Sequence, residues 1–185
     1  NLKPDFASSL VVYGAGAVGL SAVMAAKIAG CQHIIAVDVH ENRLELAKEL
    51  GATHVLNGKN VDVVAEIKQI TDGGSHYAIE TTGVPLLIKQ SLNALRPLGT
   101  VAIVGITPEV TLDIHNDLMA EGKKMVGVIE GDAVPRVFIP QLVAYYKAGR
   151  FPFDKLVKFY NFEQINQAFA DSACGISIKP VLKIS

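Results

Sequence analysis

The stretch VVYGAGAVGLSAVMAAKIAG, residues 11–30, decides the fold of this chain. An apolar, β-branched run leads into Gly14-Ala15-Gly16-Ala17-Val18-Gly19, and a segment of helical periodicity follows. Residues 7–26 carry no charge and are about as long as a membrane span. Three glycines in the middle would break such a helix, so we expect a strand, a tight turn and a separate buried helix, and no membrane partner.

The glycine turn has the spacing and the placement of a dinucleotide-binding loop. Gly14 permits the tight turn, Gly16 lets a pyrophosphate approach the backbone, and Gly19 lets helix and strand pack closely. Ala17 and Val18 would donate unpaired N–H groups at the helix N-terminus, where the partial charge is positive. The alternative is a glycine turn that merely packs, and the order strand, loop, helix disfavours it.

The alternation of strand and helix continues along the chain and predicts an α/β fold. Because parallel strands joined by right-handed helical crossovers are covered on both faces, these strands are apolar throughout. We expect a doubly wound, six-stranded parallel Rossmann sheet. The expected strands are Leu10–Tyr13, Ile34–Asp38, Thr53–Leu56, Tyr77–Thr81, Thr100–Val104 and Met125–Ile129. The expected helices are Val18–Ala29, Glu41–Leu50, Val61–Thr71 and Pro85–Leu95.

The pattern changes after Ile129, where prolines become frequent. We therefore divide the chain into a dinucleotide-binding domain, residues 1–129, and a C-terminal appendage of helices and a strand, residues 130–185. The expected elements of the appendage are helices near Gln141–Ala148 and Phe162–Ala170 and a strand near Pro180–Ile184.

Asp38 ends the second strand, where a carboxylate can accept hydrogen bonds from both hydroxyls of an adenosine ribose. A 2′-phosphate would meet that negative charge, so NAD is favoured over NADP, although the nearby Arg43 softens the discrimination. The alternative role for Asp38 is an N-cap of the next helix, and the spacing from the glycine turn favours the ribose.

Composition excludes several classes of partner. The formal net charge is −1, from 17 basic and 18 acidic residues, which leaves no field to gather nucleic acid. Cys31 and Cys174 lie far apart and suit a reducing cytoplasm, and no export signal is visible. The five histidines show no ligand spacing. We expect no catalytic residue and no metal site in this chain.

With these residues laid out, the chain resembles the zinc-dependent medium-chain alcohol dehydrogenases over its whole length. The segments that carry the resemblance are VVYGAGAVGLSAVMAAKIAG, IIAVDVHENRLELAKELGATHVLN, AIETTG, VAIVGI and INQAFADSACGISIKPVLKI. The run FIPQLVAYYKAGRFPFDKL, residues 138–156, is most similar to the aryl (benzyl) alcohol dehydrogenase branch.

The resemblance implies roles for further residues. Val18 would pack on the nicotinamide, and Asp38 and Arg43 would hold the adenosine ribose. Lys179 occupies the position at which the family usually has an arginine that binds the pyrophosphate. A lysine keeps the positive charge of the arginine but cannot form its two parallel hydrogen bonds. The remaining implied roles are Thr82 and Gly83 at the ribose pocket, backbone groups of Val104, Val128 and Glu130 at the carboxamide, and Ile106 and Ile129 facing the substrate.

The resemblance also implies the chemistry. In the family, zinc polarises the alcohol oxygen and hydride passes to NAD. Its Cys, His and Cys ligands lie upstream of the cofactor domain, so we expect this chain to lack them and to be inactive alone. The implied partners are a primary, aromatic alcohol with its aldehyde and a second copy of the chain, paired through Met125–Ile129.

Two alternatives remain open from the sequence. A zinc-free quinone reductase domain is disfavoured by Asp38, since those relatives usually take NADPH. The second alternative is a module that senses a dinucleotide and catalyses no reaction. The C-terminal stretch Ile165–Ile184 disfavours it, because such a module does not need a lysine at position 179 to contact the pyrophosphate.

Overall fold

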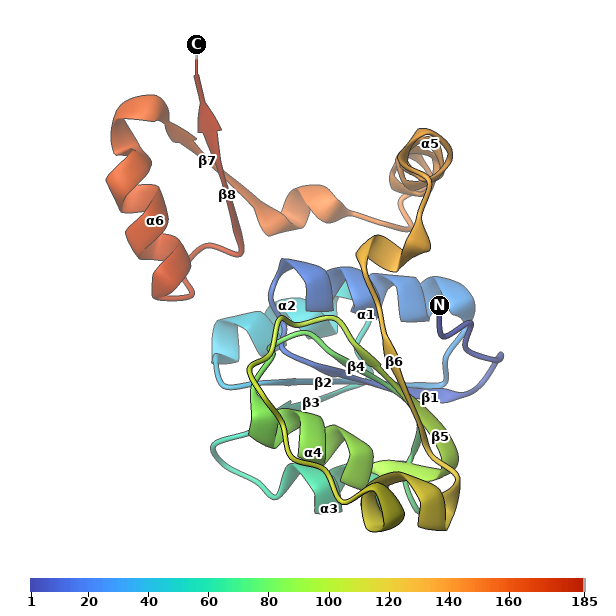
Figure 1. The fold of residues 1–185 in the computed structure, drawn as a ribbon. Helices are drawn as coiled ribbons and strands as arrows, with labels where there is room; N and C mark the ends of the chain where they lie inside the picture. The colour runs from blue at the N-terminus through green and yellow to red at the C-terminus, as the bar shows by residue number, and fades with distance from the viewer. Residues whose placement is uncertain (185) are drawn as a thin grey trace.

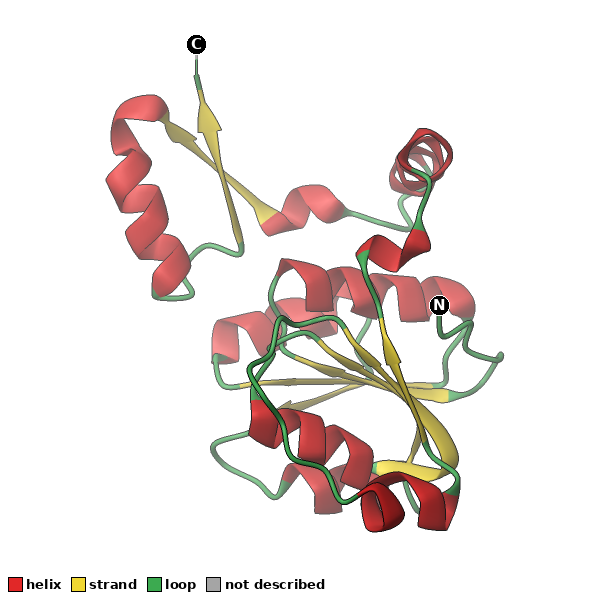
Figure 2. Ribbon diagram, in the orientation of Figure 1, coloured by secondary structure: helices red, strands yellow, loops and turns green. Residues whose placement is uncertain are grey.

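The computed structural model describes residues 1–184 and shows six parallel strands in one sheet (Figures 1 and 2). Their order is β3-β2-β1-β4-β5-β6, which confirms the doubly wound α/β fold. Each strand pairs in parallel with its neighbours. The bounds are β1 Ser9–Tyr13, β2 His33–Asp38, β3 His54–Asn57, β4 Ser75–Glu80, β5 Leu95–Ile103 and β6 Lys124–Gly127.

Helices cover both faces of the sheet, as Figure 1 shows. Val12 of β1 packs in a buried cluster with α1 and α2, whereas Val11 and Tyr13 pack in a second cluster with α3 and α4. Since successive strand residues face opposite sides, both faces of β1 are buried, which explains its apolar sequence. The helix bounds are α1 Ala17–Ala29, α2 Glu41–Leu50, α3 Val63–Ile70 and α4 Pro85–Asn93.

The expected elements of the sheet domain are all present, with bounds that differ by a few residues. The largest difference is β5, which begins at Leu95 and not at Thr100, across a register irregularity opposite Ser75 and Tyr77. Residues 114–121 form a π turn and a short 3-10 helix that the sequence analysis did not predict. No helix within residues 1–184 has the length and apolar character that a membrane crossing requires.

The C-terminal segment contains α5 Pro135–Lys147, β7 Val157–Asn161, α6 Ile165–Ala173 and β8 Lys179–Lys183. The expected start of the first helix at Gln141 is wrong. Pro135 occupies the first turn, where its missing N–H costs nothing, and Pro140 is accommodated inside the helix. Strand β7 was not predicted. It pairs in parallel with β8, and α6 forms the crossover between them.

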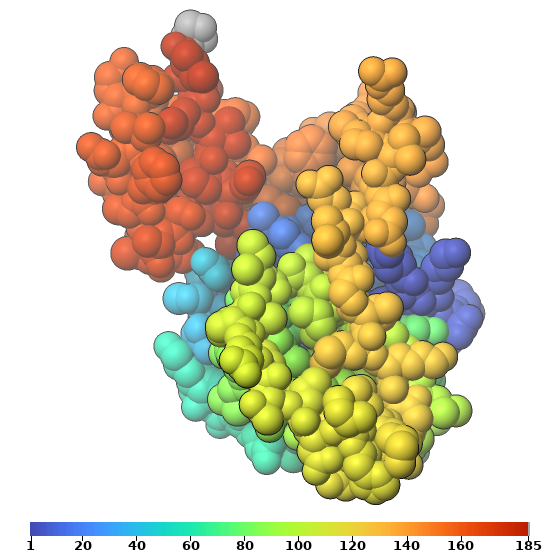
Figure 3. All heavy atoms as spheres, viewed as in Figure 1, coloured from blue at the N-terminus to red at the C-terminus, as the bar shows by residue number. Residues whose placement is uncertain are grey.

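The C-terminal segment lies on the side of the sheet domain that α1 and α2 cover (Figure 3). Leu156 is buried in the same apolar cluster as those helices. The side-chain amide of Asn42, on α2, donates to the carbonyl oxygen of Gly175 at 3.0 Å, and Lys155 forms an ion pair with Glu49. These contacts attach the segment to both ends of α2.

A polar cluster joins β7 to α6. The Asp171 carboxylate accepts hydrogen bonds from the Tyr160 hydroxyl at 2.6 Å, from Lys158 Nζ at 3.0 Å and from the Gln167 amide at 2.5 Å. These donors, Tyr160 first, lower the pKa of Asp171 to about 2. The ionised carboxylate therefore stabilises the folded segment.

We predict that this contribution depends on pH. Because the folded pKa is depressed, the stabilisation is complete above the pKa of an unfolded aspartate, about 3.9, and is lost as the pH falls toward 2. Asp171→Asn should flatten the fall in melting temperature between these limits, measured by circular dichroism. Asp154→Asn, an exposed carboxylate of the same segment, is the control. The same acid profile in both variants would contradict the assignment.

Candidate functional site

The candidate site lies at the carboxyl ends of the parallel strands. The order of the strands reverses between β1 and β4, and in open α/β sheets this switch point leaves a crevice for a ligand. The glycine turn follows β1, Asp38 closes β2, and Thr81 and Thr82 follow β4. The fold therefore gathers at one place residues that lie far apart in the sequence.

The geometry of the glycine turn requires glycine at two positions. Gly14 has φ +90, and a Cβ there would lie 2.7 Å from Thr81 Oγ1. A Cβ on Gly19 would lie 1.7 Å from the carbonyl oxygen of Gly14, because α1 packs directly onto the turn. A Cβ on Gly16 would meet nothing within 4 Å, so the backbone at Gly16 faces open space. A ligand can approach the backbone there.

The N-terminus of α1 is suited to an anion. Gly16 is the N-cap and supplies no side-chain cap, and the first turn contains no acidic residue. The first N–H groups of a helix have no intrahelical partner and carry a partial positive charge. Ala17 and Val18, at this end of the helix, line a cavity of about 360 Å³ that Asp38, Arg43 and the threonines after β4 also line. These residues fit a pyrophosphate and its ribose.

Asp38 does more than the sequence analysis expected. Its carboxylate accepts the backbone N–H groups of Ala15 at 2.7 Å, Val39 at 2.7 Å and His40 at 3.0 Å. Arg43 Nη1 lies 3.8 Å from the same carboxylate. The side chain is 6% exposed and lines the cavity. Asp38 thus fixes the glycine turn against the end of β2 and presents a negative charge to the ribose position.

Glu80 is a residue that the sequence analysis missed. It is fully buried at the end of β4. Its carboxylate accepts the N–H of Thr82 at 2.8 Å and the N–H of Gly83 at 3.0 Å, and it accepts the Thr82 hydroxyl as well. These bonds fix the loop that borders the cavity opposite Asp38. The available signal was an acidic residue inside the apolar run of β4, a position that requires hydrogen-bond partners.

A second cavity, of about 410 Å³, continues from Asp38 between α3 and α4. Its walls are mostly apolar, and Gln90 of α4 adds a polar side chain. Sites for small molecules typically have volumes of about 300–1,000 Å³, and the volume of this cavity lies within that range. His40, in the loop between β2 and α2, also lines this cavity.

The structure does not bring all the expected site residues together. Gly14, Gly16, Ala17, Val18, Asp38, Arg43 and Thr82 line the first cavity. Gly83 is held by Glu80, and Val104 and Val128 line a different, apolar cavity beside the N-terminal segment.

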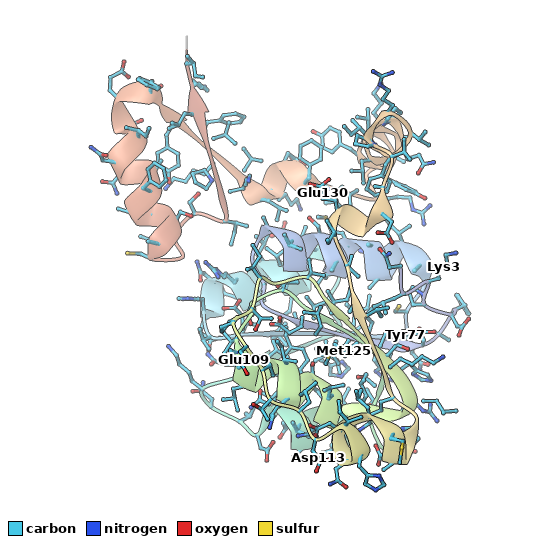
Figure 4. The ribbon with its side chains drawn as sticks, in the orientation of Figure 1. Lys3, Tyr77, Glu109, Asp113, Met125 and Glu130 are labelled. Atoms are coloured by element: carbon cyan, nitrogen blue, oxygen red, sulfur yellow. The ribbon has the colours of Figure 1, made fainter. Side chains whose placement is uncertain are left out.

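The remaining expected residues are exposed. Ile106 is 99% exposed and Ile129 is 82% exposed. Glu130 lies in the turn between β6 and α5 (Figure 4). Lys179 is exposed at the start of β8 and lines neither of the two cavities at Asp38.

Within residues 1–184, no three His, Cys, Asp or Glu side chains lie together as a set of metal ligands. A catalytic zinc ion needs three protein ligands. The described residues therefore do not fit a zinc ion, whereas the turn, the uncapped helix and Asp38 fit a dinucleotide.

Comparison with known proteins identifies the family. A family model described as zinc-binding dehydrogenase matches residues 17–144. The chain is 39% identical over 177 residues to geraniol dehydrogenase of Castellaniella defragrans, covering 94% of this chain and 48% of that protein. Similarity over so much of the chain shows common family membership.

Solved structures of similar proteins support the same family assignment. Benzyl alcohol dehydrogenase from Acinetobacter calcoaceticus has a TM-score of 0.96 and 55% identity, covering 100% of this chain and 51% of that one. An alcohol dehydrogenase zinc-binding domain protein from Burkholderia ambifaria has a TM-score of 0.95 and 52% identity, covering 100% and 50%. The chain spans about half the length of these relatives. It belongs to the zinc-binding dehydrogenase family and corresponds to the C-terminal half of a zinc-dependent medium-chain alcohol dehydrogenase.

Proposed function

We propose that this chain binds NAD(H) and is the cofactor-binding half of an oxidoreductase that interconverts a primary, aromatic alcohol and its aldehyde. The observation that carries the proposal is the uncapped N-terminus of α1, with open space at Gly16, in one cavity with the buried Asp38 carboxylate. An anion-binding helix end and a ribose-binding carboxylate in one cavity suit a dinucleotide.

The residues of this chain would bind and orient the cofactor. N–H groups of Ala17 and Val18 would hold the pyrophosphate, and Asp38 would accept the ribose hydroxyls, with its position fixed by three backbone donors. Val18, 55% exposed, would pack on the nicotinamide, which accepts or gives the hydride when bound. The described residues supply no ligand set for zinc, so their contribution is cofactor binding.

The nature of the alcohol follows from similarity alone. One relative is named benzyl alcohol dehydrogenase and another geraniol dehydrogenase. The higher identity to the former, 55% against 39%, supports an aromatic primary alcohol.

Further parts of the proposal concern the assembled enzyme in the cytoplasm. The C-terminal segment, residues 130–185, would pack with a catalytic domain as well as against the dinucleotide-binding domain of residues 1–129. The pocket would then be completed by Lys179 at the pyrophosphate, by Val104, Val128 and Glu130 at the carboxamide, and by Ile106 and Ile129 at the substrate.

The chain should prefer NADH over NADPH, because the Asp38 carboxylate would repel the 2′-phosphate. Asp38→Asn keeps an acceptor oxygen and removes the charge, so the ratio of dissociation constants should narrow by about tenfold, or ~1.4 kcal/mol. Calorimetric titration measures both ligands. Asp62→Asn, which alters a carboxylate that caps α3 by accepting two N–H groups, is the control. Tighter binding of NADPH to the unmodified chain would refute the assignment.

The polypeptide of residues 1–185 should bind NAD without stoichiometric zinc and without oxidising benzyl alcohol or geraniol. The physical reason is that none of its described side chains form a three-ligand set, and an unpolarised alcohol keeps a high pKa. Metal analysis measures the zinc content, and the absorbance of NADH measures alcohol oxidation. One zinc ion per chain together with turnover would show that the active site has been misplaced.

We also expect a homodimer through β6. This strand closes one edge of the sheet, and Val126 on it is 42% exposed. An exposed apolar edge strand favours pairing with a second copy across a two-fold axis.

Sedimentation of the unmodified chain at micromolar concentration should give a dimer, and Val126→Lys should give a monomer because it places a charge on the edge. Val143→Lys on α5 is a matched control, since Val143 is also 42% exposed. The idea fails if the unmodified chain is a monomer, or if only the control variant dissociates.

A further inference from the structure

The ladder between β4 and β5 is interrupted at His76, near the amino end of β4. The two neighbours of His76 pair with Leu95 and Thr100, which are separated by four residues of β5. One residue of β4 therefore stands opposite the segment Arg96–Gly99, which we call the β5 bulge. Because the crevice at Asp38 lies at the carboxyl ends of the parallel strands, the bulge lies at the other end of the sheet.

The backbone of the β5 bulge is unfavourable by itself. Leu98 has φ +66, a left-handed conformation that a leucine rarely adopts, and it is 73% exposed. Pro97 has no N–H group to donate to a neighbouring strand. A Cβ on Gly99 would lie 2.9 Å from the carbonyl oxygen of Arg96, so the chain turns tightly there. A segment of this kind opens easily unless side chains hold it.

Arg96 supplies a side-chain contact that holds the bulge. Its Nη1 atom lies 2.8 Å from His76 Nε2. The other ring nitrogen, Nδ1, lies 2.8 Å from the hydroxyl oxygen of Ser9 and 3.2 Å from its backbone nitrogen. Ser9 is a buried residue of β1. The ring of His76 therefore joins the β5 bulge to β1.

These partners require a neutral ring. The Arg96 guanidinium and the Ser9 N–H are both donors aimed at the ring, and a neutral imidazole accepts at one nitrogen only. The shorter contact places the lone pair on Nε2 and the ring proton on Nδ1, toward the Ser9 hydroxyl oxygen. An imidazolium has no acceptor nitrogen and would direct a second proton at the guanidinium cation. Protonation of His76 is therefore incompatible with the Arg96 contact.

The charged groups around His76 favour the neutral ring on balance. Partial burial and the charge of Arg96 lower the pKa of His76, while the Asp5 carboxylate of the N-terminal segment raises it by a smaller amount. The Asp5 carboxylate already accepts the Tyr77 hydroxyl at 3.2 Å. The Tyr77 ring (Figure 4) stacks beside the imidazole, with ring centroids 6.4 Å apart.

We propose that His76 is a pH-sensitive clasp on the β5 bulge. The neutral ring accepts from Arg96 and holds the bulge closed, whereas the imidazolium releases Arg96 so that the bulge opens locally. The clasp lies at the opposite end of the sheet from the proposed cofactor crevice, so this inference does not depend on the binding of NAD.

The direction of the pH dependence follows from the lowered pKa. Because the closed bulge lowers the pKa of His76, the ring of the opened form is protonated first as the pH falls. The clasp is closed above the pKa of an unperturbed histidine, about 6.5, and opens increasingly as the pH falls below it.

Hydrogen exchange of the 185-residue chain, followed residue by residue by NMR, measures the opening. After correction for intrinsic exchange rates, the backbone amides of the β5 bulge should exchange about tenfold faster at pH 5 than at pH 7.5. The amide of Val12 in β1 should show no such step. Titration of the His76 ring signal should give a pKa below about 6.5.

Three variants separate the clasp from a general effect of acid. His76→Gln removes the titrating group and should abolish the pH step, whatever its exchange rate at pH 7.5. Arg96→Gln removes the charge beside the ring and should raise the pKa of His76. His115→Gln is the matched control, because His115 is exposed in the turn of residues 114–118. It should leave the pH step unchanged.

Three results would overturn the clasp: equal exchange of the bulge at both pH values, a pH step that survives His76→Gln, or a His76 pKa at or above about 6.5. Binding of NAD is measured separately, so a failure of the clasp leaves the proposed function standing.

Discussion

The close packing of α1 on the turn after β1 is the constraint on which the rest of the molecule depends. A side chain at Gly19 would lie 1.7 Å from the Gly14 carbonyl oxygen, so this contact is possible only between backbone atoms. It places the first N–H groups of α1 at the switch point of the sheet, where β1 separates β2 from β4. The anion-binding end of the helix and the ligand crevice are therefore products of the same contact.

Two buried carboxylates hold the two sides of that crevice. Asp38 accepts three backbone N–H groups, one of them from the glycine turn. Glu80 accepts the N–H groups of Thr82 and Gly83 across the crevice. Each carboxylate is stable when buried because its donors replace the lost water. The loops that would contact a cofactor are therefore fixed before it binds, which reduces the entropy lost on binding.

The C-terminal segment is built differently from the sheet domain. Strand β7 pairs with β8, the Asp171 cluster joins β7 to α6, and α5 has no buried residue. Apolar side chains such as Phe169 and Phe138 are exposed there. This exposure, together with the match to about half of each longer relative, supports the proposal that the segment packs against another domain.

The sequence by itself determined the alternation of strands and helices, the parallel sheet and the dinucleotide turn, because glycine placement and apolar runs are local signals. It did not determine β7, whose partner β8 is chosen only when α6 brings the two together. The placement of the residues around the crevice was likewise settled by packing. The start of α5 instead follows Pro135, a local signal that favours the first turn of a helix. Glu80 carries no local motif. Its role arises because the tertiary structure buries a carboxylate beside two loop N–H groups, and burial makes unpaired polar atoms unfavourable.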